Sequence, residues 1–284
     1  MPQHFVAPPE WHWYIVWYFF LGGIAGGAYV LGTLLRLLGE PRDQAVSRIA
    51  FLVSFPAVAI CPILLTLDLG RPERFLHMLI DPQRLTLNFK YWSPMSVGAW
   101  VLLIFSVFAF VSFLEALVQG ALARWLSGGL GHIVTLVGGV FGLFLAGYTG
   151  VLLSVSNQPI WSDTWTLGGL FLASGLSVAA ATLALLASSH AATEAKLSRA
   201  DRYFILLELA LLVLFFVTLG AVGGALVRGP LALLWLLVLA GTLLPLAIHR
   251  RSTSARRLPS MVTAVLVLIG GFALRVIVIF APQL

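Results

Sequence analysis

Eight apolar runs, each about as long as a membrane-spanning helix, constrain this chain more than any other feature. A helix that crosses the hydrocarbon core of a bilayer needs about 20 predominantly apolar residues. The runs lie near residues 13–37, 48–68, 95–118, 131–154, 166–189, 203–226, 230–249 and 259–281. Because they are continuous rather than alternating, they indicate helices and exclude a transmembrane β-barrel. We therefore predict an all-α integral membrane protein with eight transmembrane helices.

The composition excludes the water-soluble classes of protein. Only 10% of the 284 residues are charged and 60% are hydrophobic, whereas a soluble domain carries about 25% charged residues. The single cysteine, Cys61, excludes a disulfide framework and a CxxC cluster site, so any iron–sulfur cluster would belong to another subunit. The first residues, MPQHFVAPPEWHW, lack a basic n-region and predict no removable signal peptide.

The basic residues predict the orientation of the protein. The loops after the first, third, fifth and seventh runs hold eleven of them: Arg36, Arg42, Arg48, Arg124, Lys196, Arg199, Arg202, Arg250, Arg251, Arg256 and Arg257. The opposite loops hold five: Arg71, Arg74, Arg84, Lys90 and Arg228. Cytoplasmic loops carry the excess of Lys and Arg. We therefore expect both termini to be periplasmic or extracellular, and the net charge of +6 to reflect this rule rather than nucleic-acid binding.

Small residues in the first run predict close helix contacts. The stretch GGIAGGAY contains two overlapping pairs, Gly22/Gly26 and Gly23/Gly27, spaced by four residues. Such spacing lets helix backbones approach closely in a membrane.

The histidines argue against a haem in this protein. A haem held between spanning helices needs two histidines that face each other within the bundle. The six histidines all lie outside the apolar runs or at their ends: His4, His12, His77, His132, His190 and His249.

Two charges fall inside apolar runs, where they are costly and often functional. Glu208 lies about two turns into the sixth run and is either a proton-relay carboxylate or a hydrogen-bonded acid near the interface. Arg275 lies in the outer third of the eighth run. It either faces an anionic or carbonyl ligand or forms an internal salt bridge, for which Asp68 is one candidate partner.

Further polar groups gather at the predicted outer level of the membrane. They comprise Tyr14 and Tyr18 on the first run, Asp68 at the end of the second, and Tyr148 and Asn157 on or after the fourth. A site that protonates and deprotonates a small lipid-soluble molecule needs such carboxylate, phenol and amide groups. Helix ends are polar in any membrane protein, which is the alternative explanation.

The charged stretch TLDLGRPERFLHML, residues 66–79, marks the outer end of the second run. We expect Asp68 to remain at membrane depth and Gly70 to end the helix in a left-handed conformation. Pro72 then begins a short helix at its first position.

Three motifs resemble the NrfD-like family, which includes the membrane subunit of polysulfide reductase. They are DLGRPERFLHML at 68–79, SPMSVGAW at 93–100 and GYTGVLLSVSNQPIW at 147–161, supported by the opening WHWYIVWYFFLGGIAGG at 11–27. The likeness is strong over the first four runs. Over the last four it rests on length and hydropathy.

The resemblance implies eight helices in two four-helix bundles, here residues 1–160 with a quinone site and 161–284, within one polytopic domain. It implies a prokaryotic inner membrane, menaquinone or another quinone bound at the outer surface, and no haem or metal in this protein. The expected partners are a ferredoxin-like iron–sulfur subunit and a molybdenum or tungsten bis-pterin catalytic subunit on the outer face.

Site residues follow from the same resemblance. In polysulfide-reductase-like members the quinone is contacted from the first and fourth spans and an acid ends the second. By position this implies Asp68, Tyr148 and Tyr18 as the catalytic group. Asn157 and Trp161 would shape the outer loop beside the quinone, and the residues themselves add Tyr14, Arg71 and Arg275 as expected quinone contacts. This protein has Ile15 and Tyr18 where polysulfide reductase has an asparagine and a histidine, so we expect proton handling to shift to Asp68 or another acid.

The outer loop between the second and third runs is expected to dock the iron–sulfur partner. The docking residues would be Glu73, Arg74, His77, Arg84 and Lys90, and Glu208 would carry protons from the cytoplasm. The predicted function is that of a quinone-reactive anchor subunit of an oxidoreductase complex in anaerobic respiration. The alternatives are an ion or solute transporter, in which Asp68, Glu208 and Arg275 line a path, and a passive anchor without quinone chemistry.

Overall fold

The protein is a set of long α-helices in the computed structural model, which describes residues 9–118, 128–228, 230–251 and 257–283. The helices are α1 (Trp13–Leu38), α2 (Gln44–Leu67), α3 (Pro94–Leu117), α5 (Gly129–Ser154), α6 (Leu167–Leu186), α7 (Ala191–Leu219), α8 (Gly223–Arg228), α9 (Leu234–Arg251) and α10 (Arg257–Phe280). Short 3-10 helices cover η1 (Pro41–Asp43), η2 (Pro72–Met78), η3 (Gly220–Val222) and η4 (Ala281–Gln283). Within these ranges β-pairing is limited to one isolated bridge, Ile80 with Leu87.

Seven of the helices in the described ranges are long and apolar enough to cross a membrane. The apolar part of α9, Leu234–Ile248, is shorter than the other seven. The prediction of an all-helical, multi-pass membrane protein is confirmed, and the eighth span stays a prediction. Side chains of His4, Arg124, His249, Arg250, Arg251, Arg256 and Arg257, used in the sequence arguments, lie outside the described part.

Most helix boundaries agree with the apolar runs, but α7 does not. It begins at Ala191 rather than near 203, because the polar residues 191–202 are mostly good helix formers that a search for apolar runs passes over. It ends at Leu219 because Gly220 has a φ of +53°, a left-handed conformation that favours glycine. The predicted end near 226 is therefore wrong.

The end of α2 also differs from the expectation. Asp68 caps the helix in a right-handed conformation, with its backbone N–H donating to the carbonyl of Leu64. Among the described glycines, the positive φ belongs to Gly220 and not to Gly70, so the predicted left-handed stop is wrong. The short helix η2 begins at Pro72 as predicted.

Helix α1 lies at the centre of the molecule and packs against α2, α5, α6 and α10. On one side, a Cβ atom added to Gly26 would collide with the backbone of Gly142 in α5. On another side, a Cβ on Gly27 would lie 2.8 Å from the carbonyl oxygen of Gly175 in α6. The predicted close packing is confirmed at these positions, whereas Gly22 faces open space.

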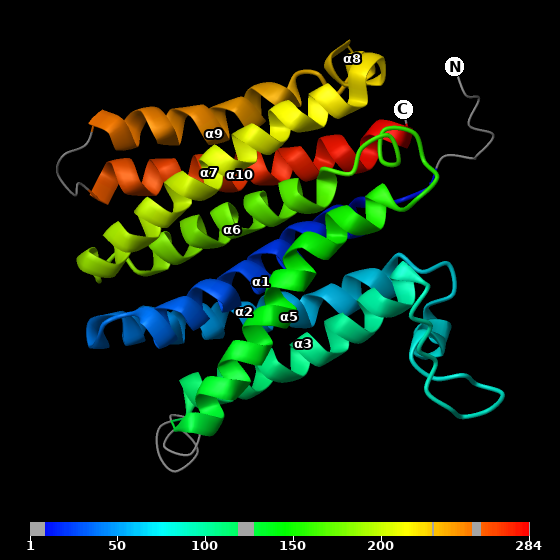
Figure 1. Cartoon of the computed structure of the whole chain (residues 1–284), viewed down its shortest axis with the longest axis horizontal. Helices are drawn as coiled ribbons and strands as arrows, with labels where there is room; N and C mark the ends of the chain where they lie inside the picture. Colours follow the sequence, from blue (N-terminus) through cyan, green and yellow to red (C-terminus); the bar gives the residue numbers. More distant parts are fainter. Residues whose placement is uncertain (1–8, 119–127, 229, 252–256, 284) are drawn as a thin grey trace.

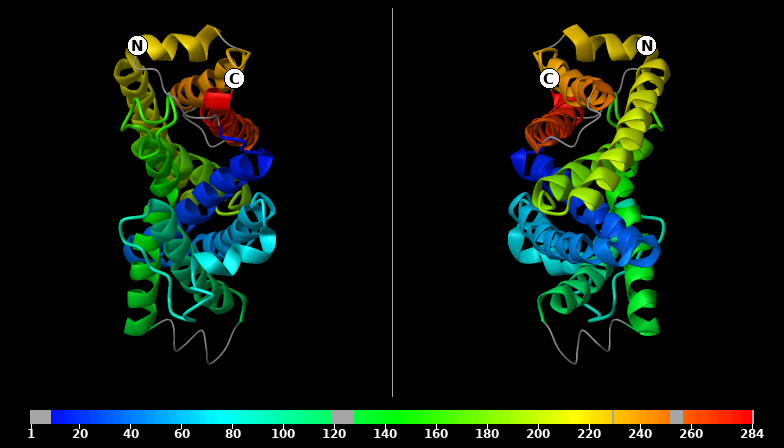
Figure 2. Two further views of the ribbon diagram at one scale, coloured as in Figure 1. Left: turned by 90° about the vertical axis from the view of Figure 1, so that its right-hand side faces the viewer. Right: turned by 90° about the vertical axis from the view of Figure 1, so that its left-hand side faces the viewer.

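The remaining helices lie on two sides of α1 (Figures 1 and 2). Helices α2, α3 and α5 lie on one side, and α6, α7, α9 and α10 on the other. Since α1 and α5 also pack directly on α6, the division into two bundles at residue 160 stays a prediction.

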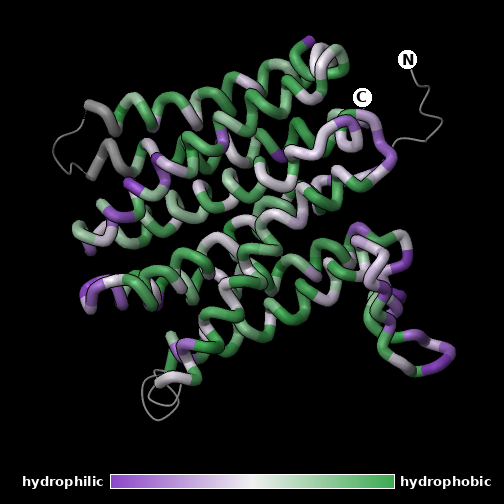
Figure 3. The backbone as a smooth tube through the Cα atoms, viewed as in Figure 1, coloured by the Kyte–Doolittle hydropathy of each residue, from purple (hydrophilic) through white to green (hydrophobic). Residues whose placement is uncertain are grey.

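The loops gather at two opposite ends of the helices, and the hydrophilic residues gather with them (Figures 1 and 3). One end holds the segments 68–93 and 155–166, the start of α1 and the end of α10. The other holds 39–43 and 187–190. We call the first the outer end and the second the inner end, after the orientation that the basic residues predict.

Candidate functional site

A carboxylate–imidazole pair joins the outer ends of α1 and α2. Oδ1 of Asp68 lies 3.2 Å from Nδ1 of His12 and accepts a hydrogen bond from the backbone N–H of His12 at 3.4 Å. The Asp68 side chain is only 10% exposed, whereas that of His12 is 69% exposed. The pair therefore links a shielded carboxylate to the surface.

Sequence reasoning treated His12 only as a potential haem ligand and missed this pairing. The available signal was topological. Two consecutive antiparallel helices bring the start of the first next to the end of the second, which is where His12 and Asp68 lie.

Tyr18 presents a hydroxyl with open hydrogen-bonding capacity. The residue is 4% exposed and its ring packs edge-on against Phe19, with ring centroids 5.3 Å apart. No described residue is a hydrogen-bond partner of the Tyr18 hydroxyl, although every fully buried side-chain oxygen or nitrogen in the described part has one. The Tyr18 hydroxyl is therefore not completely enclosed.

Tyr148 is held more firmly. Its hydroxyl donates to the carbonyl oxygen of Pro94 at the start of α3, at 2.5 Å. Its ring stacks on Phe144 with centroids 5.7 Å apart and covers Gly98, where a Cβ atom would overlap the ring. The Tyr148 proton is committed to α3, and its oxygen, which also meets the Gly98 backbone, has room for one further hydrogen bond as an acceptor.

The two phenols are electrostatic neighbours, together with Cys61 of α2. These side chains come from three helices, α1, α2 and α5, and the shared quinone site of Tyr18 and Tyr148 stays a prediction. Asp68 lies two turns beyond Cys61 on α2, about 10 Å nearer the outer end. Tyr14, one turn before Tyr18 on α1, is 43% exposed on the same outer side.

Arg275 belongs to a different, fully buried cluster. Its Nη1 donates to Ser174 Oγ at 3.0 Å and to the Gly271 carbonyl at 2.7 Å, and its Nε donates to the Phe19 carbonyl at 3.4 Å. Its acidic neighbour is Glu208, which is 4% exposed and also meets Ser174. The suggested pairing with Asp68 is wrong, because Arg275 points from α10 toward α6 and α1, and Asp68 pairs with His12.

The residues expected to dock a partner are all exposed on the segment 69–93, which protrudes from the outer end (Figure 1). They are Glu73, Arg74, His77, Arg84 and Lys90, and Arg71, expected as a quinone contact, is exposed on the same segment. The same segment exposes large apolar side chains: Phe75, Leu76, Met78, Ile80, Leu85, Leu87, Phe89, Tyr91 and Trp92.

The two residues of the 155–166 loop that are predicted to shape it beside the quinone, Asn157 and Trp161, lie in different environments. Asn157 is exposed, whereas Trp161 is 1% exposed and its indole N–H donates to the Val278 carbonyl at 2.6 Å. The Trp161 ring also packs against Trp11 at 4.8 Å. Trp161 therefore fastens the loop to α10 and to the segment that precedes α1.

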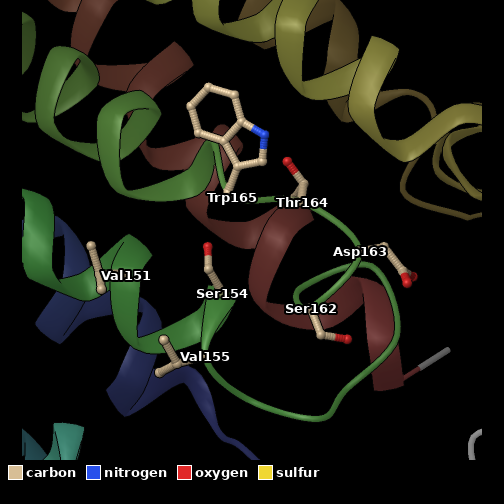
Figure 4. A pocket seen from close by; sticks show the side chains of 7 residues that line it. All are labelled: Val151, Ser154, Val155, Ser162, Asp163, Thr164 and Trp165. Atoms are coloured by element: carbon tan, nitrogen blue, oxygen red, sulfur yellow. The ribbon is translucent and has the colours of Figure 1, made fainter.

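An open pocket of about 400 Å³ lies between this loop and the end of α5 (Figure 4). It is lined by Val151, Ser154, Val155, Ser162, Asp163, Thr164 and Trp165. Its one carboxylate, Asp163, accepts the backbone N–H of Ile160 at 2.9 Å, and none of the predicted site residues lines it. In the described ranges, no group of three or more His, Cys, Asp or Glu side chains could hold a metal ion.

Comparison with known proteins gives a family match over nearly the whole sequence. Residues 3–284 match the family described as "Polysulphide reductase, NrfD". The sequence is 28% identical over 310 residues to Protein NrfD of Escherichia coli (strain K12), which covers 96% of this protein and 95% of that one.

Two further relatives are named as parts of reductases. The sequence is 28% identical over 311 residues to a polysulfide reductase chain of Wolinella succinogenes, covering 96% of this protein and 94% of the relative. It is 25% identical over 91 residues to a selenate reductase subunit of Mesobacillus selenatarsenatis, covering 32% and 19%.

Proposed function

The protein belongs to the family Polysulphide reductase, NrfD, and from that membership we propose that it is the quinone-reactive membrane subunit of a molybdopterin oxidoreductase complex. It exchanges electrons between menaquinone or another quinone and an iron–sulfur partner subunit. The proposal includes eight spans, with α9 as the seventh, in two four-helix bundles. It also includes a prokaryotic inner membrane and both termini on the outer side.

The observation that carries the proposal is the open hydroxyl of Tyr18. A buried phenol whose hydroxyl has no partner among the described residues and is not completely enclosed is suited to bind a ligand carbonyl or hydroxyl. Quinones offer such oxygens on an apolar ring, and the surroundings of Tyr18 in α1, α2 and α5 are apolar and aromatic. The residues present therefore fit the group.

Tyr148 has a second role at the same place. Its own hydroxyl donates a hydrogen bond to the Pro94 carbonyl, so its oxygen is suited to accept a hydrogen bond from a hydroxyl group of a quinol. Tyr18 donates a hydrogen bond to one oxygen of the bound molecule, and Tyr148 accepts a hydrogen bond from another. When bound, a quinol supplies two electrons and two protons, and a quinone takes them up.

Proton exchange falls to Asp68 and His12. Asp68 Oδ1 accepts a proton at the shielded outer end of α2 and passes it to the imidazole 3.2 Å away. The imidazole of His12 can bind and release a proton and is exposed, so it releases the proton to water.

The protruding segment 69–93 supplies the docking surface for the iron–sulfur partner. It combines exposed apolar side chains with Glu73, Arg74, His77, Arg84 and Lys90, the mixture of apolar anchors and charged rim that protein interfaces use. Two relatives are named as parts of polysulfide and selenate reductases, which supports a role beside catalytic and iron–sulfur subunits.

The test is to purify the protein with the subunits that accompany it, measure bound quinone and iron, and assay quinol-linked reduction. The proposal predicts bound quinone, iron–sulfur clusters in a partner, and turnover that a quinone-site inhibitor stops. A passive anchor would be indicated if the complex contained no quinone and the inhibitor did not change its turnover. Solute uptake by the protein alone would favour a transporter.

A further inference from the structure

A second buried acid, Asp201, lies on the inner side of Glu208 and has no part in the site described above. It is 5% exposed, near the third turn of α7, and its Oδ1 accepts a hydrogen bond from the Ser177 hydroxyl of α6 at 2.6 Å. Its Oδ2 has no hydrogen bond to any described residue. Since no fully buried oxygen in the described part lacks a partner, Oδ2 reaches accessible space.

A small cavity adjoins this carboxylate. Its volume is about 10 Å³, close to the minimum that holds one water molecule. It lies between α6, α7 and α10, and its polar lining consists of Asp201, Ser198 and Thr263, with three alanines of α6 and Ala264 completing the wall. A polar cavity beside a buried carboxylate is a place where water is stable.

Asp201 and Glu208 lie on the same side of α7, because they are seven residues, or two turns, apart. The facing side of α6 carries Ser177 and Ser174, one turn apart. The Ser177 hydroxyl donates a hydrogen bond to Asp201, and Ser174 is hydrogen-bonded to Glu208. Each of the two acids on α7 is therefore paired with a serine on α6. Ser174 also accepts from Arg275, whose Nε bonds the carbonyl of Phe19, the residue next to Tyr18.

These two groups of contacts lie one turn apart on α6, and together they define a polar track from the inner side of α7 to the α1 backbone beside Tyr18. The simplest alternative explanation is that the serine–acid pairs only hold α6 and α7 together, as polar side chains do in membranes. That explanation does not account for the water-sized cavity or for the second acid two turns away. Packing alone would be served by one hydrogen bond without a buried carboxylate, which is expensive in a membrane.

We propose that Asp201 is the proton-exchange group at the inner entrance of this track and that it shares a proton with Glu208. A proton leaves the carboxylic acid of Asp201, and the carboxylate of Glu208 gains one. Ser177 and Ser174 each accept one proton and release another, so they end unchanged, and water in the cavity beside Asp201 exchanges protons with Asp201 from the inner side. Arg275 keeps its charge and balances Glu208 when that acid is ionised.

The charged groups that bear on Asp201 are few in the described part. Glu208 is its electrostatic neighbour on α7, Arg275 of α10 acts on Glu208, and α6 contributes hydroxyls and alanines. The proposal rests on the proposed function for its purpose, since quinone chemistry would be linked to proton uptake from the inner side. The exchange of a proton at Asp201 can be tested without quinone.

The first test is infrared spectroscopy of the protein reconstituted in liposomes with a different pH on each side. We expect a carboxylic-acid C=O band that disappears in Asp201→Asn and whose intensity follows the pH on the inner-end side. Glu194→Gln, a matched change in the first turn of the same helix, should keep the band. The proposal would be overturned if the intensity of the band did not change with the pH on the inner-end side. It would also be overturned if no carboxylic-acid band disappeared in Asp201→Asn.

The second test uses the intact complex in liposomes, run in the direction of quinone reduction, and compares protons taken up from the inner-end side with electrons delivered to quinone. In Asp201→Asn we expect this ratio to fall at least about 10-fold. An unchanged ratio would overturn the proposal and leave the proposed function intact. If the wild-type complex exchanges no electrons with quinone, the proposed function fails, and the infrared result alone decides the role of Asp201.

Discussion

Asp68 at the end of α2 and His12 in front of α1 form a pair in which the shielded carboxylate lies 3.2 Å from the exposed imidazole. This contact joins the outer ends of the antiparallel helices α1 and α2. It also links the shielded Asp68 carboxylate to an imidazole that is exposed to water. It gives Asp68 a partner that can itself bind and release protons, which a guanidinium cannot do.

Replacing Asp68 by Asn should reduce quinol-linked turnover by at least about 10-fold, because an amide cannot accept and release a proton. The amide oxygen still accepts the backbone N–H of His12, so we expect the complex to assemble. Turnover of the purified complex is the measurement, and the amounts of the assembled subunits are the control. Wild-type turnover in Asp68→Asn would remove this carboxylate from the mechanism.

His12→Asn tests the other half of the pair. The variant removes the imidazole that receives the proton from Asp68, and we expect slower proton release at the outer surface with quinone content unchanged. Added imidazole should partly restore turnover, because a small buffer can reach the exposed position of His12. A variant that turns over at the wild-type rate without imidazole would show that protons leave by another route.

Removing the charge of Arg275 should destabilise the protein strongly. Arg275→Met removes the donors to Ser174, Gly271 and Phe19 and leaves Glu208 without its cationic neighbour, and buried polar groups left without a partner cost about 1–3 kcal/mol. Thermal unfolding of the detergent-solubilised protein should show a lower midpoint. Adding Glu208→Gln to Arg275→Met should recover part of the loss, and a double variant less stable than Arg275→Met would contradict the pairing.

The close contact of α1 and α5 can be tested with two glycines on the same helix. Gly26→Val places a side chain against the Gly142 backbone, whereas Gly22→Val enters open space. Overpacking of this kind costs about 1–3 kcal/mol, so the melting temperature of Gly26→Val should fall while that of Gly22→Val stays near wild type. Equal melting temperatures would contradict the arrangement of α1 and α5.

The positions of the helices could be predicted from the sequence because apolar runs of spanning length leave little choice in a membrane. The start of α7 could not, since residues 191–202 are helical through propensity and packing rather than hydropathy. That error hid Asp201, which the sequence argument leaves in a loop although it is buried in the helix.

The side-chain pairings were harder to predict than the helices. The phenols of Tyr18 and Tyr148 could be assigned to one place from the resemblance, and the structure makes them neighbours. The partners of Asp68 and Arg275 could not, because several opposite charges lie at similar predicted depths and sequence does not give the helix rotations that choose among them. Trp161, expected beside the site, instead bonds Val278 across the molecule.

The central claim, that Tyr18 donates to a bound quinone, is tested most directly by quinone titration of wild type, Tyr18→Phe and Tyr148→Phe. Loss of one hydrogen bond at Tyr18 should weaken binding about 2- to 10-fold. Tyr148→Phe should weaken it less, since the Tyr148 proton already goes to Pro94. A Tyr18→Phe variant that binds quinone with wild-type affinity would contradict the claim.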